Sequence, residues 1–115
     1  MRPKSTRGLA TEQEEYIARC YGGRRSPSSG ANSFDQGDVS YDILTDHGGI
    51  EFLAECKVTE AASISIKRSV WDKIAQEALG QGKQPCMFLR FRSDDGKHLD
   101  LVVREVNDDL EILDQ

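Results

Sequence analysis

The strongest constraint on the fold is a pair of neighbouring segments in which apolar and polar residues alternate, residues 38–45 and 50–58. Their sequences are DVSYDILT and IEFLAECKV, and this alternation is typical of β-strands with one apolar face. The residues between them, DHGG, are a turn signal, so the sequence predicts a β-hairpin. The face expected to enter the core carries Val39, Tyr41, Ile43, Phe52, Ala54 and Cys56.

The opposite face of the predicted hairpin is polar. A DHGG turn pairs Thr45 with Ile50. In that register one set of polar side chains shares the second face: Asp38, Ser40, Asp42, Glu55 and Lys57. Diagonal neighbours on paired strands lie about 7–8 Å apart, so either aspartate can converge with Glu55. Converging carboxylates repel unless a cation lies between them, and their hard oxygens suit Mg²⁺ or Mn²⁺. Ordinary cross-strand ion pairs on a solvated face are the alternative interpretation.

Other segments predict two helices and two further strands. Thr11 and Glu14 form a T-x-x-E capping box, which predicts a helix of roughly 11 residues that ends at Gly22. Residues 24–37, rich in Ser, Gly and Arg, are expected to form a functional loop. A second helix is predicted after Ser69 as its N-cap, and the strands are PCMFLRFR and LDLVVREV. The predicted order is α-β-β-α-β-β in one domain, an α/β fold with a mixed β-sheet flanked by helices.

Composition and charge narrow the classes of protein. With 115 residues, 37% of them hydrophobic, the chain fits one globular domain. No apolar run approaches the ~20 residues of a membrane span, and the N-terminus lacks a signal-peptide core, so we expect a cytoplasmic protein. The three cysteines have no CxxC spacing, which argues against a structural zinc site and against a disulfide framework.

The net charge of −5 is unevenly distributed. Residues 1–30 carry six Lys or Arg against three Glu, and residues 94–115 carry eight acidic residues against two basic ones. We expect residues 1–8 to be a flexible basic arm and residues 108–115 an acidic tail. The asymmetry suits a protein that meets an anion with one surface, and it fits two ordinary solvated faces equally well.

Several motifs resemble those of a known family. GDV at 37–39 followed by ECK at 55–57 resembles the Asp…Glu-x-Lys signature of the PD-(D/E)XK nuclease superfamily. The stretch FLAECKVTEAASISIKRSVWDKI resembles the archaeal-type Holliday-junction resolvases and related phage nucleases, in which an E-x-K-x-T strand precedes a helix. RSPSSG and RGLATE also resemble the Arg-Ser-rich loop and first helix of that group, so the resemblance covers roughly residues 7 to 92. It implies a restriction-endonuclease-like sheet.

The resemblance also implies roles for individual residues. Asp38 and Glu55 would bind the metal, and Lys57 would be the catalytic lysine. Glu12 would reach the site from the first helix. Cys56 would offer its backbone carbonyl to the metal while its thiol packs in the core. The candidate DNA contacts are Arg7, Arg24, Arg25, Ser26, Ser28, Ser29, Lys67 and Arg68.

Two positions of this pattern stay open. Asp42 lies at the shorter Asp-to-Glu interval that some relatives show, whereas Asp38 opens the strand and is favoured. On the first helix, Glu14 belongs to the predicted capping box, which leaves Glu12 and Glu15 as candidates.

The function that the resemblance implies is a Mg²⁺-dependent, structure-selective DNA endonuclease, in which Mn²⁺ substitutes for Mg²⁺. The expected substrate is a Holliday junction, cut by a homodimer in the cytoplasm of a bacterial or archaeal cell, with a virus-encoded origin as a further option. The alternatives are a nuclease of the same chemistry with a nicked, flap or other branched DNA target, and a non-catalytic DNA-binding module of the same fold.

Overall fold

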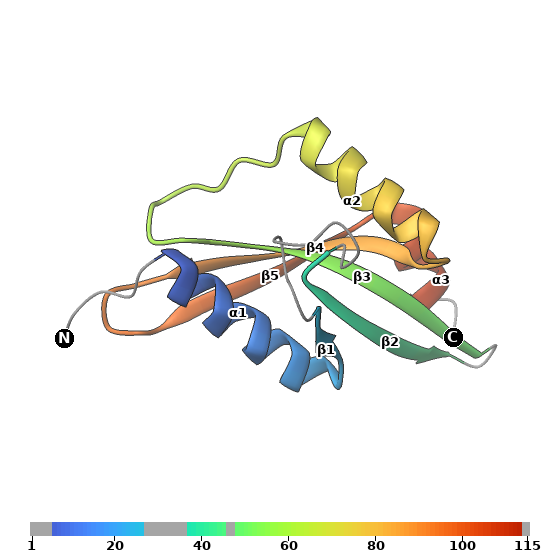
Figure 1. Ribbon diagram of the computed structural model, residues 1–115, viewed down its shortest axis with the longest axis horizontal. Coiled ribbons are helices and arrows are strands. Elements are labelled where there is room, and N and C mark those ends of the chain that lie inside the picture. Colours follow the sequence, from blue (N-terminus) through green and yellow to red (C-terminus); the bar gives the residue numbers. More distant parts are fainter. Residues whose placement is uncertain (1–5, 27–36, 46–47, 114–115) are drawn as a thin grey trace.

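A five-stranded mixed sheet forms the centre of the protein (Figure 1). The computed structural model describes residues 6–26, 37–45 and 48–113. The strands lie across the sheet in the order β1 (Arg24–Arg25), β2 (Val39–Thr45), β3 (Gly48–Thr59), β4 (Gln84–Arg92) and β5 (His98–Arg104). Among the described residues, β3 and β4 are the only parallel neighbours. The other three pairs of neighbouring strands, β1–β2, β2–β3 and β4–β5, are antiparallel.

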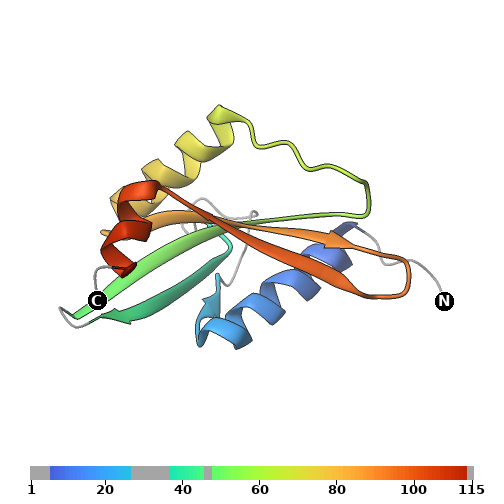
Figure 2. The same cartoon turned by 180° about the vertical axis from the view of Figure 1, so that it is seen from behind.

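Helices cover both faces of the sheet. They are α1 (Thr6–Tyr21), α2 (Arg68–Gly80) and α3 (Val106–Leu113). The two longer helices, α1 and α2, lie on opposite sides of the sheet in both views (Figures 1 and 2). Parallel strands require a crossover connection, and α2 lies in the connection from β3 to β4. The chain therefore forms one small α/β domain. No helix among the described residues is long and apolar enough to cross a membrane.

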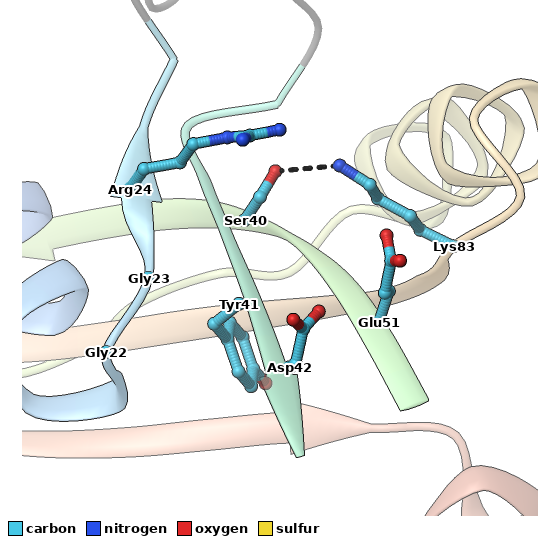
Figure 3. A pocket seen from close by; sticks show the side chains of 8 residues that line it. All are labelled: Gly22, Gly23, Arg24, Ser40, Tyr41, Asp42, Glu51 and Lys83. Atoms are coloured by element: carbon cyan, nitrogen blue, oxygen red, sulfur yellow. Dashed lines mark hydrogen bonds between the residues drawn. The ribbon is translucent and has the colours of Figure 1, made fainter. Parts of the chain in front are cut away.

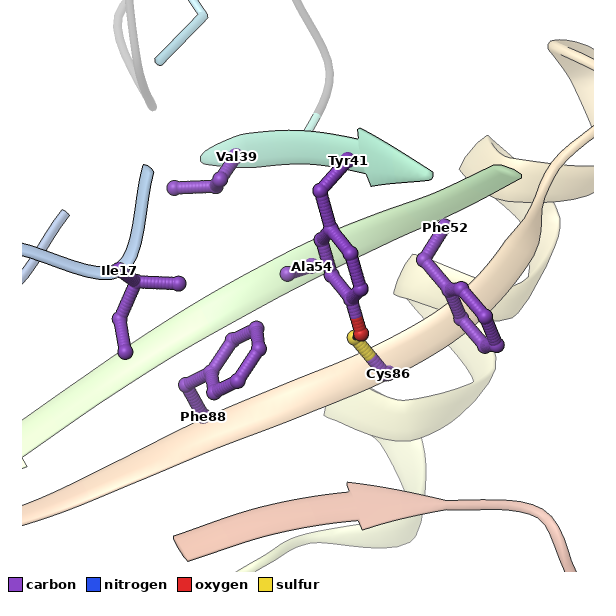
Figure 4. Packing of buried hydrophobic residues seen from close by; sticks show 7 residues of the cluster. All are labelled: Ile17, Val39, Tyr41, Phe52, Ala54, Cys86 and Phe88. Carbon is purple, nitrogen blue, oxygen red and sulfur yellow. The ribbon is translucent and has the colours of Figure 1, made fainter. Parts of the chain in front are cut away.

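The core is divided by the sheet. On the α1 side, Ile17 packs on a cluster from three strands: Val39, Tyr41, Phe52, Ala54, Cys86 and Phe88 (Figure 4). On the α2 side, Leu53 packs under Ile74 and Ala78. The predicted apolar face of the hairpin is confirmed, because Ile43 and Cys56 also pack against the first cluster. One face of β2 and β3 is therefore fixed in the core, and the polar face lies on the α2 side.

The register of the hairpin differs from the prediction. The structure pairs Thr45 with Gly48 and not with Ile50. Each cross-strand pair is consequently shifted by two residues, and Ser40 lies opposite Leu53 instead of Glu55. Because side chains alternate with a period of two, this shift leaves every residue on its predicted face.

Several element boundaries also differ from the prediction. Helix α1 begins at Thr6, because Leu9 and Ile17 share one buried face of the helix and extend its packing toward the N-terminus. Residues 6–8 therefore belong to a helix and not to a basic arm. Two residues of the expected loop form β1, and α2 has Lys67 at its N-cap position in place of Ser69. The expected acidic tail contains α3, whose Ile112 packs on the core.

Candidate functional site

Asp38 is fixed at the point where β2 begins, beside the middle of β3. Its backbone N–H donates to the carbonyl of Ala54 at 2.8 Å, and its carbonyl accepts from the N–H of Ser26 at 2.9 Å. The carboxylate is also held, because Oδ2 accepts from the backbone N–H of Cys56 at 2.8 Å. Asp38 is buried, with 8% of its surface exposed. The backbone of β3 at Cys56 thus orients the carboxylate of Asp38.

Gly37 makes this placement of Asp38 possible. Its φ of +75° lies in the left-handed region that residues with a Cβ rarely adopt. A Cβ at this position would also lie 2.6 Å from Cγ of Leu53, a residue buried under α2. The chain therefore needs glycine here both for its backbone conformation and for the close approach to Leu53.

Replacing Gly37 by Ala is expected to lower the free energy of unfolding by about 2–5 kcal/mol, which combines left-handed strain with overpacking against Leu53. Gly22→Ala is the matched control, because Gly22 has a similar φ of +64° and no atom within 4 Å of an added Cβ. Strain alone should cost that variant about 1–2 kcal/mol. Urea unfolding of both variants measures the difference, and equal losses would show that the contact with Leu53 contributes nothing.

Glu55 and Lys57 project from β3 on the same side of the sheet as Asp38. The carboxylate Oε1 of Glu55 lies 3.7 Å from Nζ of Lys57, and both side chains are partly exposed. Burial raises the pKa of Glu55, and the negative charge of Asp38 raises it further. The positive charges of Lys57 and Lys73 act in the opposite direction without cancelling the shift. Asp38 and Glu55 are therefore close enough to repel each other, as the sequence predicted.

This pair of carboxylates fits a divalent cation in its chemistry, because a cation between the two would relieve their repulsion. Within residues 6–26, 37–45 and 48–113, no three His, Cys, Asp or Glu side chains gather around one point. The donor set for a metal is consequently the two carboxylates together with backbone and solvent oxygens. Such a partial set suits Mg²⁺, which keeps several waters when it binds to proteins.

The thiol of Cys56 is not part of this donor set. Its side chain points away from the two carboxylates and packs against the α1-side core, as expected. Burial raises the pKa of the Cys56 thiol well above its ordinary value, and the negative charges of Asp38 and Glu14 add to the effect. A protonated thiol is neither a metal ligand nor a nucleophile. Only the backbone of Cys56 can therefore serve the site.

Helix α1 contributes Glu14 to the surroundings of Cys56. The side chain of Glu14 is almost fully buried and accepts from Nε of Arg25 at 3.0 Å. Its charge acts on Cys56, the residue whose N–H holds Asp38. The assignment of Glu14 to a capping box was wrong, because the helix begins at Thr6 and Glu14 lies in its interior.

Glu12, the favoured candidate of the sequence analysis, is not brought to this site. Successive residues of a helix are rotated by about 100°, so Glu12 and Glu14 project on opposite sides of α1. Glu12 lies 3.2 Å from Nε of Arg92 and 3.9 Å from Arg90, both on β4. Glu15, the other candidate, is mostly exposed and lies 3.8 Å from Arg25.

Asp42, the alternative metal ligand, also lies elsewhere. In the strand register Asp42 lies opposite Glu51 of β3. Glu55 lies further along β3, at the level of Asp38. Asp42 instead lines a hollow beside Lys83 (Figure 3). The structure therefore favours Asp38 over Asp42 as the partner of Glu55.

The candidate DNA contacts are scattered around this site. Arg24 is exposed on β1, Arg25 is bound to Glu14, and Ser26 bonds to Asp38 through its backbone. At the start of α2, Lys67 is the N-cap residue and Arg68 bonds to Asp72 at 2.9 Å. The side chain of Arg7, together with Ser28 and Ser29, lies outside the described residues.

Gln13 is a residue of this region that the sequence analysis missed. It is fully buried under α1, and its Nε2 donates to the carbonyls of Lys57 at 2.9 Å and Phe88 at 3.1 Å. Gln13 therefore fixes the backbone of β3 at Lys57 from the opposite face of the sheet. Its signal in the sequence is a polar residue midway between Leu9 and Ile17, at helical spacing.

Comparisons with protein-family models, with curated proteins and with solved structures find no match for this chain.

Proposed function

We propose that this protein is a metal-dependent endonuclease of the PD-(D/E)XK type that hydrolyses phosphodiester bonds in branched DNA, with the four-way junction as its preferred substrate. One observation carries the proposal. Asp38 and Glu55 converge from two paired strands, and Lys57 lies 3.7 Å from Glu55 on the same face. This geometry resembles the Asp…Glu-x-Lys arrangement of such nucleases, which supports the proposal, and core packing alone gives no reason for it.

Each of these residues would have its own role in catalysis. Asp38 and Glu55 would hold Mg²⁺, with the carbonyl of Cys56 as a further ligand. The bound ion supplies Lewis-acid stabilisation of negative charge on the scissile phosphate. Lys57 is partly exposed, so its ammonium group can donate to a nonbridging phosphate oxygen as charge develops there. Glu14 keeps Arg25 near the site, and the N–H of Cys56 holds Asp38 in the ligating orientation.

A four-way junction has to be cut in two strands, and one copy of this site cuts one strand. A homodimer with two-fold symmetry supplies two equivalent sites and is therefore part of the resolvase form of the proposal.

The test is a panel of four-way junction, flap, nicked and linear duplex DNA, incubated with Mg²⁺ and either the wild type or Glu55→Gln. We expect the wild type to cut the junction fastest and Glu55→Gln to cut none of the substrates. Preferential cutting of a flap or a nick would support the proposed metal-dependent hydrolysis but show that the four-way junction is not the preferred substrate. An intact panel, or undiminished cleavage by the variant, would refute the nuclease proposal.

A non-catalytic DNA-binding module is the second candidate. It is favoured by the finding that no three ligating side chains gather at one point in the described part of the chain. Calorimetric titration with Mn²⁺ in the presence of junction DNA separates the candidates. Binding that is lost in Glu55→Gln supports the nuclease, and no measurable binding to the wild type supports the module.

A further inference from the structure

A polar hollow lies next to the Asp38–Glu55 site and has no role in the proposed chemistry. Its volume is about 280 Å³, and it opens between β1, β2 and the start of β4. The polar side chains that line it are Arg24, Ser40, Asp42, Glu51 and Lys83 (Figure 3). The sequence places Ser40 on the polar face of the hairpin but gives no indication of Lys83.

Three hydrogen-bond donors meet at one end of this hollow. Nζ of Lys83 donates to Oγ of Ser40 at 3.1 Å, which leaves the hydroxyl hydrogen of Ser40 free to donate. Arg24 lies directly opposite Ser40 in the β1–β2 register, and its side chain extends across β2 toward the Ser40–Lys83 pair (Figure 3). Among the described residues, neither Arg24 nor Lys83 forms an ion pair, although two carboxylates line the same hollow. Two cations and a hydroxyl at one point are a suitable set for a phosphate.

The position of this set relative to the candidate site is fixed by β2. Ser40 follows Asp38 by two residues, which corresponds to about 6.6–6.8 Å along an extended strand. Consecutive phosphates of one nucleic-acid strand are separated by a similar distance. A DNA strand with one phosphate at Asp38 and Glu55 would therefore bring a neighbouring phosphate to the donors in the hollow.

The far end of the hollow has the opposite charge. Asp42 and Glu51 are paired across β2 and β3, one step beyond Ser40 and away from Asp38. These carboxylates would repel a third phosphate that continued along the same line. The bound DNA strand would consequently have to turn away from the β-sheet here, as DNA strands do at a branch point.

We propose that Arg24, Ser40 and Lys83 form a subsite for the phosphate next to the one that is cut. The role of the subsite rests on the proposed nuclease function, but its affinity for a DNA phosphate can be measured without cleavage.

The test compares Lys83→Ala with Lys97→Ala, which removes the same charge from an exposed lysine in the β4–β5 turn. Binding of junction DNA without a divalent metal is measured by fluorescence anisotropy over a range of salt concentrations. For Lys83→Ala we expect the affinity for DNA to fall on the order of 10-fold. The slope of log K against log salt is negative, and its magnitude should decrease by about 0.7–0.9. Lys97→Ala is expected to bind like the wild type.

A second measurement locates the phosphate in cleavable DNA. A neutral methylphosphonate replaces, one at a time, each phosphate that flanks the cut. At one of these positions it should slow cleavage by the wild type and add nothing to the defect of Lys83→Ala. Equal binding by Lys83→Ala and Lys97→Ala would overturn the subsite whether or not the protein cuts DNA. If no DNA is cut, the nuclease proposal fails, and the binding comparison alone decides the subsite.

Discussion

Replacing Asp38 by Asn is expected to slow DNA cleavage by at least about 10²-fold while the protein keeps its fold. The amide oxygen of Asn can still accept the hydrogen bond from the N–H of Cys56, which is 2.8 Å long in the wild type. The backbone bonds from residue 38 to Ala54 and Ser26 are also unaffected. The substitution therefore removes mainly the charge that would bind the metal. Single-turnover cleavage of junction DNA measures the loss, and circular dichroism confirms the fold.

Asp42→Asn is the matched control for this prediction. It makes the same chemical change on the same strand and on the same face, but opposite Glu51 and away from Glu55. We expect this variant to cut DNA as fast as the wild type or faster, because it removes a negative charge beside the path of the DNA. Comparable losses in both variants would mean that the general charge of this face matters and that Asp38 has no special role.

The two faces of the hairpin could be predicted from the sequence even though the predicted register was wrong by two residues. Side chains alternate with a period of two, so this shift moves no residue to the other face. DHGG is compatible with a four-residue turn and with a two-residue turn, and the sequence does not distinguish them. The resulting shift of two residues changed the partner of Ser40 but left Asp38 and Glu55 on one face. A shift of one residue would have moved one of the two strands into the core with its charges.

Which glutamate of α1 is buried could not be predicted, because the answer depends on where the helix begins. In the sequence, a capping box at Thr11 explains Glu14 as a local structural residue, which favours Glu12 in its place. Leu9, Gln13 and Ile17 form a buried stripe that extends to the observed start of the helix. In the sequence this stripe does not read as an apolar helical repeat, because its middle residue, Gln13, is polar. A buried glutamine is costly unless bonded, and its bonds go to strands that lie far away in sequence.

Contacts between distant segments were the other part that the sequence did not reveal. Lys83 and Ser40 are 43 positions apart, and only the assembled sheet brings them together. Arg90 did leave a signal, because it alternates with Cys86 and Phe88 and therefore points into the α1-side core. Its partner there, Asp100 at 2.7 Å, depends on the pairing of β4 with β5.

Glu55→Gln is expected to abolish cleavage and, at the same time, to stabilise the metal-free protein at neutral pH. Burial and the charge of Asp38 raise the pKa of Glu55 above its ordinary value of 4.5, so ionisation of Glu55 is unfavourable in the folded protein. The stability that this residue contributes is complete below the pKa of the unfolded chain and is lost as pH rises through the higher pKa of the folded protein. Glutamine has no proton to lose and avoids this cost.

Thermal unfolding of both proteins between pH 4 and pH 8 measures this effect. The two melting temperatures should agree at the acidic end, and the variant should become the more stable protein as pH rises. Glu51→Gln is the control, since it makes the same change at an exposed position of the same strand face. Added Mg²⁺ should reverse the order by stabilising only the wild type, because a ligand stabilises the state that binds it. A variant that is less stable than the wild type at neutral pH without metal would mean that the Glu55–Lys57 ion pair outweighs the repulsion from Asp38. The site would then be a structural ion pair, with no unfavourable charge for a metal to relieve.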